Sequence, residues 1–350
     1  SPVRKDGPVA VFEVCLEDSR SGSAHRLIVM GQTDHEKWVA ALRGAMQQYS
    51  RGVPAPERVE QADIDAVIGR VLRFVPQDFR PLTLLGRGSF GRIVKAQHLA
   101  TGRIYALKVI DKAKFQCPKN LTEVRRERKI LESVQHPFIV GYHGMFETGS
   151  KIYFVFDFLC GGELFYHTQQ SPTRSLSEQA CRFYFAEMAL ALEHLRVNRV
   201  MHRDIKGNNF VLDADGHAVL VDFGFAKFNT ERAKNKSSCG TMAYIAPEVL
   251  VKAPAGYGHE VDWWGLGVVC FAMLTGFYPF VRSTSQKTAQ AIVSSSLRFP
   301  PTPTISAEAQ ELVTKLLVKN PAERVASLEQ LKQLAFFRGW DWEATLRREM

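Results

Sequence analysis

The sequence predicts an α+β fold with two lobes, the first rich in β-strands and the second rich in helices. Two patterns lead to this prediction. Short apolar strands separated by glycine turns fill residues 79–110 and 152–160. After Gly162 the pattern is mainly helical, and two short strands within residues 210–221 interrupt it. The β-rich half therefore precedes the helical half along the chain.

A smaller unit, residues 1–49, precedes the two lobes. Residues 9–15 alternate between apolar and polar side chains and residues 27–30 are apolar, so we expect a pair of strands. A helix with Trp38 on its apolar face should follow them. Residues 50–77 have the composition of a linker and contain an amphipathic helical pattern.

The composition of the 350-residue chain, with 45% apolar and 23% charged residues, is that of a globular protein. No apolar run approaches the ~18 residues of a transmembrane helix. Six cysteines are scattered without a C-x-x-C pair, which argues for a reducing compartment and against a zinc site or a disulfide framework. The formal charge is +9, but the basic residues are dispersed, so we expect no nucleic-acid partner. The sequence begins at Ser1 rather than Met, which indicates a fragment.

A glycine-rich motif stands at the start of the β-rich lobe. It comprises Gly86, Arg87, Gly88, Ser89, Phe90 and Gly91. This spacing alone is a weak signal, because it also marks dinucleotide-binding folds. Here the residues from Ile93 onward continue as a strand instead of opening a helix. The glycines therefore lie at the tip of a β-hairpin, where the backbone can close over phosphates; an ordinary glycine-rich turn is the alternative.

Lys108 lies among apolar residues of the next strand, where its charge would be costly to bury without an anion. A nucleotide phosphate or a carboxylate would serve. Glu127, on the helix predicted to follow, is a candidate partner. The alternative for Glu127 is a solvated helix face.

Three oxygen-bearing side chains are expected to meet in the second lobe. Asp204 and Asn209 lie in a loop just before a short hairpin, and Lys206 lies between them. The hairpin should bring Asp222 back beside this loop. Hard cations such as Mg²⁺ prefer oxygen ligands, so the cluster is suited to a magnesium-bound phosphate.

Together these motifs resemble the signatures of the eukaryotic protein kinases. H-R-D-x-K-x-x-N stands at residues 202–209, D-F-G at 222–224 and A-P-E at 246–248. The likeness runs over residues 79–345. It implies the bilobal protein kinase fold for residues 78–350, with a small lobe at 78–157 and a large lobe at 158–350. It also implies that Glu248 and Arg324 form a structural pair in the large lobe.

The resemblance implies ATP and Mg²⁺ as cofactors. Lys108 would hold the α- and β-phosphates, Glu127 would orient it, and Asp222 and Asn209 would bind Mg²⁺. Phe156 resembles the gatekeeper, and the hinge that follows it would read adenine. Besides the glycine-rich loop, the resemblance implies these further nucleotide-binding residues: Ile93, Ala106, Phe156, Asp157, Leu159 and Glu163.

For the transfer step, Asp204 would accept the proton of the substrate hydroxyl and Lys206 would steady the γ-phosphate. The lysine two residues after Asp204 is typical of Ser/Thr kinases, and Thr241 agrees. The resemblance therefore implies protein substrates with Ser or Thr acceptors.

Residues 223–227 and 238–241 resemble the AGC group, especially protein kinase B and cAMP-dependent protein kinase. Within that group Ser237 occupies the position that an upstream kinase phosphorylates, with Ser238 as the neighbouring alternative. A phosphate on Ser237 would pair with Arg203, beside the catalytic aspartate.

Residues 1–49 resemble the end of a pleckstrin-homology domain, a β-sandwich. This implies a cytoplasmic protein that a phosphoinositide recruits, in its full-length form, to the inner face of the plasma membrane. The lipid-binding loop of such domains lies nearer the N-terminus than the residues given. We therefore expect no phosphoinositide binding through that loop in this chain.

The chain departs from the AGC pattern at three positions that contact substrate arginines. They carry Asn208, Ala272 and Met242-Ala243 in place of acidic or Pro-Glu residues, which leaves Glu163. A guanidinium needs a carboxylate for a strong bidentate contact, so we predict weak arginine selection. The given sequence ends at Met350 without the F-x-x-F motif of an AGC tail, which indicates either a truncated chain or a divergent kinase. Without that tail we expect the Glu127 helix to be less firmly held and the activity to be low.

Two other functions compete with phosphate transfer. A pseudokinase scaffold would usually lack the strand lysine or a catalytic aspartate, whereas this chain has both. A membrane adaptor would act through residues 1–49 independently of nucleotide. A kinase for small molecules is disfavoured, because residues 239–241 and 246–248 suit a polypeptide acceptor.

Overall fold

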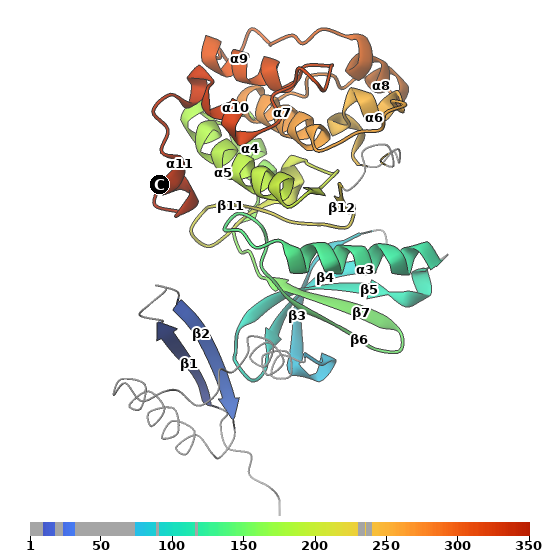
Figure 1. The fold of residues 1–350 in the computed structure, drawn as a ribbon, viewed down its shortest axis with the longest axis vertical. Coiled ribbons are helices and arrows are strands. Elements are labelled where there is room, and N and C mark those ends of the chain that lie inside the picture. The colour runs from blue at the N-terminus through green and yellow to red at the C-terminus, as the bar shows by residue number, and fades with distance from the viewer. Residues whose placement is uncertain are drawn as a thin grey trace, which may run out of the picture.

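The computed structural model describes residues 74–88, 91–115, 118–229, 235 and 240–350, together with strands β1 (Ala10–Glu17) and β2 (Ala24–Gly31). Within these residues the chain forms a β-sheet lobe and a helical lobe (Figure 1). No described helix combines the length and the apolar character that a membrane crossing would need.

Strands β1 and β2 pair antiparallel, from Ala10 opposite Gly31 to Glu17 opposite Ala24. The expected pair of N-terminal strands is therefore present. The helices expected around Trp38 and within the linker lie outside the described residues. The domain boundaries at residues 49 and 77 stay predictions.

The small lobe is a five-stranded antiparallel sheet in the order β3-β4-β5-β7-β6. Its strands are β3 (Phe79–Arg87), β4 (Gly91–His98), β5 (Ile104–Asp111), β6 (Tyr142–Glu147) and β7 (Lys151–Asp157). Short 3-10 turns precede β3 (Pro76–Asp78) and follow β5 (Lys112–Lys114). An aromatic cluster that includes Phe74, Phe79 and Tyr105 packs on one face of the sheet.

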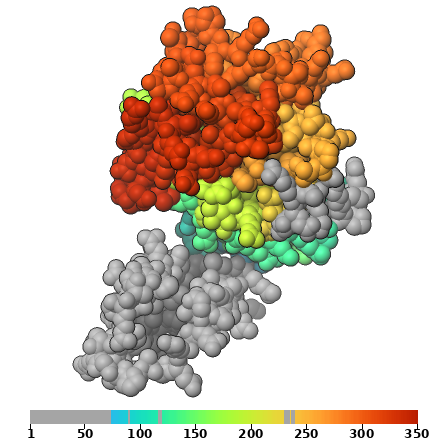
Figure 2. Space-filling view, turned by 45° about the horizontal axis from the view of Figure 1, so that its top comes forward, coloured from blue at the N-terminus to red at the C-terminus, as the bar shows by residue number. Residues whose placement is uncertain are grey.

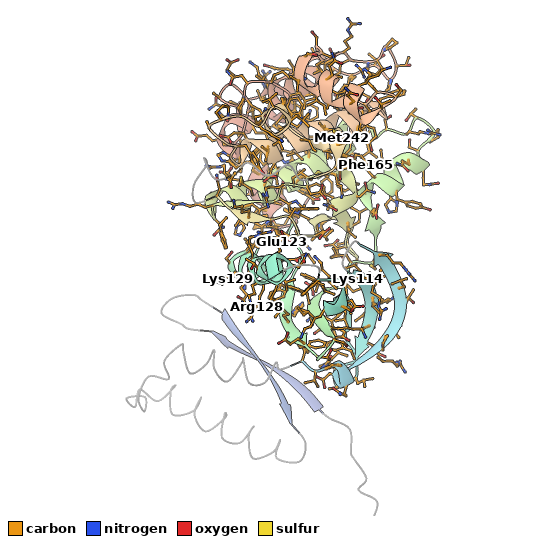
Figure 3. All side chains as sticks on the ribbon, turned by 90° about the vertical axis from the view of Figure 1, so that its right-hand side faces the viewer. Lys114, Glu123, Arg128, Lys129, Phe165 and Met242 are labelled. Atoms are coloured by element: carbon orange, nitrogen blue, oxygen red, sulfur yellow. The ribbon has the colours of Figure 1, made fainter. Side chains whose placement is uncertain are left out.

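Helix α3 (Pro118–Ser133) lies between this sheet and the large lobe. Figure 3 shows it from another side, with Glu123, Arg128 and Lys129 labelled along it. A helix in this position can carry side chains toward the junction of the two lobes.

Two details of the small lobe differ from the prediction. Strand β6 was not predicted, because its sequence, YHGMFE, lacks a clear alternation and contains Gly144. The strand expected at residues 152–160 ends at Asp157, because the chain there leaves the sheet for the large lobe.

The large lobe is mainly helical. Its helices are α4 (Leu164–Gln170), α5 (Glu178–Val197), α6 (Pro247–Leu250), α7 (Glu260–Thr275), α8 (Ser285–Ser294), α9 (Ala307–Leu316), α10 (Leu328–Lys332) and α11 (Trp342–Leu346). Its 3-10 turns are Gly207–Asn209, Met242–Tyr244 and Ala335–Phe337. Figure 2 shows the C-terminal residues, in red, on the surface of this lobe.

Helix α7 is the centre of the large lobe. Every residue from Val261 to Thr275 is buried. A helix that is apolar on all sides is stable only inside a protein, so the other helices pack around α7. Gly276 ends the helix in the left-handed conformation, with φ of 76°, which glycine adopts without steric cost.

Short strands bring the loops of the large lobe together. The hairpin of β10 (Phe210–Leu212) and β11 (Ala218–Leu220) is joined by β8 (Gly162–Glu163), and β9 (Val200–Met201) pairs with β12 (Lys227–Phe228). Only the β10–β11 hairpin was predicted. Strands of two residues carry too little pattern to be recognised in a sequence.

Candidate active site

The lysine of the β-rich lobe has two carboxylate partners. Lys108, on β5, lies 2.5 Å from Oε1 of Glu127 on α3 and 3.3 Å from Oδ1 of Asp222. Burial lowers the pKa of Lys108, but the charges of Glu127 and Asp222 outweigh it and raise the pKa above its ordinary value. Lys108 is therefore a fixed cation that links the two lobes.

Asp222 combines half-exposure with backbone strain. Its φ of 61° lies in the left-handed region, which costs a non-glycine residue about 1–3 kcal/mol. Burial raises the pKa of its carboxyl group, but Lys108 and His202 more than offset this and hold the pKa below its usual value. Its side chain is 50% exposed, so an anionic oxygen faces the space between the lobes.

Asp204 is buried and its carboxylate is fully engaged. Oδ1 accepts hydrogen bonds from the backbone N–H of Thr241 at 3.0 Å and from its hydroxyl at 3.1 Å. Oδ2 lies 2.7 Å from Nζ of Lys206. Asn209 donates its amide to the Asp204 carbonyl at 2.8 Å. The expected group of Asp204, Lys206 and Asn209 is thus assembled, and Thr241 is held beside it.

The backbone fixes Asn209 next to Asp222. The N–H of Val221 donates to the carbonyl of Asn209 at 2.8 Å, one residue before Asp222. The amide nitrogen of Asn209 is directed to Asp204, so its oxygen is the atom left for a cation. Asn209 and Asp222 together offer the oxygen ligands that Mg²⁺ prefers.

Asp262 supports the catalytic loop, and its role was not predicted. This buried carboxylate accepts the backbone N–H groups of His202 and Arg203, at 2.8 and 2.7 Å. Burial raises the pKa of Asp262. The sequence offered only an aspartate in an apolar helix, which is itself the signal of a buried hydrogen-bonded carboxylate.

The glycine-rich turn lies where the sequence placed it, between β3 and β4. A side chain at Gly91 would collide with the carbonyl oxygen of Val109 on β5, so only glycine allows this close approach. Arg87 pairs with Arg92 across the hairpin, and Gly86 pairs with Ile93. Ser89 and Phe90 lie outside the described residues.

Three of the residues that the resemblance assigns to the nucleotide lie on neighbouring strands, Ile93 on β4, Ala106 on β5 and Phe156 on β7. Ile93 pairs with Lys108, and Ala106 pairs with Phe156. Asp157 ends β7, and its carboxylate is held by Arg103 at 2.8 Å and His143 at 2.7 Å.

Beyond the end of β7, Leu159 packs against the main core. Glu163, on β8, accepts a hydrogen bond from Asn208 Nδ2 at 2.6 Å.

Glu248 and Arg324 form the expected pair. Two parallel hydrogen bonds of 2.7 and 2.9 Å join them, and both side chains are buried. Removal of one partner from a buried ion pair typically costs about 3–5 kcal/mol, so this pair is structural.

Ser237 and Ser238, the candidates for phosphorylation, lie outside the described residues. Arg203, the residue expected to pair with a phosphate there, donates to the Phe225 carbonyl at 2.8 Å and to the Tyr257 hydroxyl at 3.3 Å.

The family of the chain follows from comparison with known proteins. A family model described as protein kinase domain matches residues 79–337. The chain therefore belongs to the protein kinase family.

Sequence comparison with curated relatives indicates which class of protein kinase the chain belongs to. The chain is 35% identical over 321 residues to a RAC family serine/threonine-protein kinase homolog of Dictyostelium discoideum, covering 91% of this chain and 68% of that protein. It is 34% identical over 338 residues to RAC-beta serine/threonine-protein kinase B of Xenopus laevis, covering 91% and 68%. It is 40% identical over 280 residues to serine/threonine-protein kinase Sgk1 of Gallus gallus, covering 79% and 63%. The chain is thus a serine/threonine protein kinase with relatives in the AGC group.

Proposed function

We propose that this chain transfers the γ-phosphate of Mg·ATP to Ser or Thr hydroxyls of protein substrates. The observation that carries the proposal is the junction between the lobes. There the ammonium group of Lys108 contacts the carboxylates of Glu127 and Asp222. Close by in the chain's fold, the carboxylate of Asp204 accepts a hydrogen bond from the hydroxyl of Thr241. Since the chain spans 68%, 68% and 63% of the three relatives in the order described above, its substrates and partners are part of the proposal.

In the proposed reaction, Lys108 holds the α- and β-phosphates and Glu127 keeps its ammonium in place. The oxygen atoms of Asn209 and Asp222 would hold Mg²⁺, which would supply positive charge against the phosphates. The contribution of these residues is mainly position and electrostatic stabilisation, because phosphoryl transfer needs little covalent chemistry from the protein.

Asp204 is the proposed acceptor of the substrate proton. The hydrogen bond from Thr241 shows that Oδ1 of Asp204 can accept a bond from an alcohol, at 3.1 Å. A substrate hydroxyl that displaced the Thr241 hydroxyl from this oxygen would be oriented by the carboxylate for attack on the γ-phosphate. Lys206, 2.7 Å from Oδ2, would stabilise the phosphate as charge develops.

Finer aspects of the function belong to the same proposal. They are activation by phosphorylation of Ser237, recruitment of the full-length protein to a phosphoinositide membrane, and a cytoplasmic location. The resemblance of residues 1–49 to a pleckstrin-homology domain supports the membrane step. The β1–β2 hairpin is compatible with that resemblance.

Replacement of Asp204 by Asn tests the proposed reaction. We expect transfer from Mg·ATP to a Ser peptide to fall by about 10²-fold or more, because the amide cannot take the proton. Binding of ATP should remain within about twofold of the wild type, since Asp204 does not hold the nucleotide. An Asp204→Asn protein that keeps full activity would show that another group accepts the proton.

A further inference from the structure

Arg348, just beyond α11, joins two segments that are far apart in the sequence. Its Nη1 lies 2.8 Å from Oδ2 of Asp213, in the turn of the β10–β11 hairpin. Its Nη2 donates to the carbonyl oxygen of Pro137, in the connection between α3 and β6. The guanidinium also lies over the ring of Phe138, 5.4 Å from its centroid. Arg348 itself has a φ of 59°, in the strained left-handed region.

Each of these segments leads to a residue of the active site. The connection 134–141 follows α3, which carries Glu127. The β10–β11 hairpin ends two residues before Asp222. Arg348 therefore contacts the segment behind one carboxylate partner of Lys108 and the segment before the other.

The two segments are also hydrogen-bonded to each other. Leu220 N–H donates to the carbonyl of Phe138 at 2.9 Å, and Val140 N–H donates to the carbonyl of Leu220 at 3.0 Å. Arg348 contacts both of these hydrogen-bonded segments, at Pro137 in the connection and at Asp213 in the hairpin turn. In Figure 1 the chain end lies beside the β11 segment, at the boundary of the lobes.

Asp213 connects Arg348 to the rest of the β10–β11 hairpin. Its Oδ1 accepts the backbone N–H groups of Asp215 and His217, each at 3.0 Å, so its carboxylate fixes the turn. A bidentate-capable guanidinium suits such a site better than an ammonium, because it reaches a carboxylate and a carbonyl at once.

We infer that Arg348 is a positioning residue that fixes the Glu127 helix relative to Asp222, and so keeps both carboxylates at Lys108. It touches neither nucleotide nor substrate. The inference rests on the proposed kinase function for its effect on rate, but its structural part stands on the contacts alone.

The test compares Arg348→Met with two controls in the whole chain. Arg347→Met removes a neighbouring arginine that forms an exposed ion pair with Glu349. Asp341→Ala removes the N-cap of α11, whose side chain accepts the Ala344 N–H at 2.8 Å. This change destabilises the same helix but leaves the contacts of Arg348 in place.

We expect Arg348→Met to lower kcat about tenfold while KM for ATP changes less than about twofold, because the site is less often in the productive arrangement. The kcat of Arg348→Lys should lie between those of the wild type and Arg348→Met, since an ammonium group reaches one partner at a time. Both controls should keep kcat within about twofold at temperatures well below their Tm. If Asp341→Ala and Arg348→Met lower kcat equally, Arg348 only stabilises the C-terminal helix.

Amide hydrogen exchange gives a readout that does not depend on activity. In Arg348→Met the amides of Val140 and Leu220 should exchange about tenfold faster, because their hydrogen bonds join the two segments that Arg348 contacts. Unchanged exchange at these two amides would overturn the inference, whatever the activity. A wild-type chain without transferase activity would contradict the proposed function, and the exchange measurement would still decide the role of Arg348.

Discussion

At the scale of single residues, the site depends on carboxylates with different tasks. Asp204 is buried and hydrogen-bonded on both oxygens, whereas Asp222 is half-exposed and strained. The hydrogen bonds hold Asp204, the proposed proton acceptor, in one orientation, whereas the exposed carboxylate of Asp222 is accessible to a cation. Sequence motifs predicted both residues, but only the structure shows Asp262 holding the backbone of the same loop.

Glu163 illustrates how one substitution alters a surface carboxylate. Asn208 donates to Oε2 of Glu163 at 2.6 Å, so one oxygen already has a partner. A substrate arginine would compete with this amide, and no second carboxylate from position 208 assists it. Ala272, another of the three changed positions, is buried in α7.

We predict that the wild type prefers a Ser peptide with two upstream arginines over an alanine-substituted peptide by less than about tenfold in kcat/KM. Asn208→Glu should raise this preference about tenfold, because it adds a carboxylate and frees Glu163. Gln170→Glu, which adds the same charge at the exposed end of α4, is the control. A strict requirement for both arginines in the wild type would contradict the prediction.

At the scale of elements, the connection after α3 matters more than its length indicates. It carries His136, whose Nδ1 accepts the Phe138 N–H at 3.2 Å and whose ring lies 5.0 Å from that of His194. Burial, followed by the charges of His194 and Arg348, lowers the pKa of His136 to about 4. A neutral imidazole is also what the hydrogen bond to Nδ1 requires.

This predicts acid sensitivity of the fold. Below pH ~6.5 the unfolded chain takes up a proton at His136 that the folded chain refuses until about pH 4. The free energy of unfolding should therefore fall over this window as pH decreases, by about 1–3 kcal/mol from this group. His136→Asn keeps a hydrogen-bond acceptor but has no titrating group, so it should reduce the decline of the free energy of unfolding with falling pH. His167→Asn, at an exposed position, is the control and should leave that decline unchanged. Urea unfolding at pH 7, 5.5 and 4.5 measures the effect, and equal slopes for wild type and His136→Asn would contradict it.

Elements also set the limit of what the sequence could predict. The glycine hairpin, Lys108 and the β10–β11 hairpin were predicted from local pattern, because each has a strong periodic or turn signal. Strand β6 and the two-residue strands were not, because hydrogen bonds to distant segments define them. The contacts of Arg348 were also beyond sequence reasoning, since they join residues 135 and 211 positions apart.

At the scale of the whole molecule, the function depends on how the two lobes meet. Lys108 comes from the sheet, Glu127 from α3 and Asp222 from the large lobe. The contact between Lys108 and Asp222 crosses from one lobe to the other. The buried Glu248–Arg324 pair and helix α7 make the large lobe a rigid base. The lobes therefore supply complementary halves of one proposed site, and a change that separates them should reduce transfer.

The most direct test is phosphate transfer from Mg·ATP to three peptides that differ only in a Ser, Thr or Tyr acceptor. We predict transfer to Ser and Thr, with Tyr slower by about 10²-fold or more, and loss of transfer when EDTA removes the metal ion. Nucleotide binding without transfer to any of the three peptides, in protein phosphorylated at Ser237, would contradict the proposed phosphate transfer and indicate a scaffold. Equal transfer to Tyr would contradict the assignment of Ser/Thr acceptors.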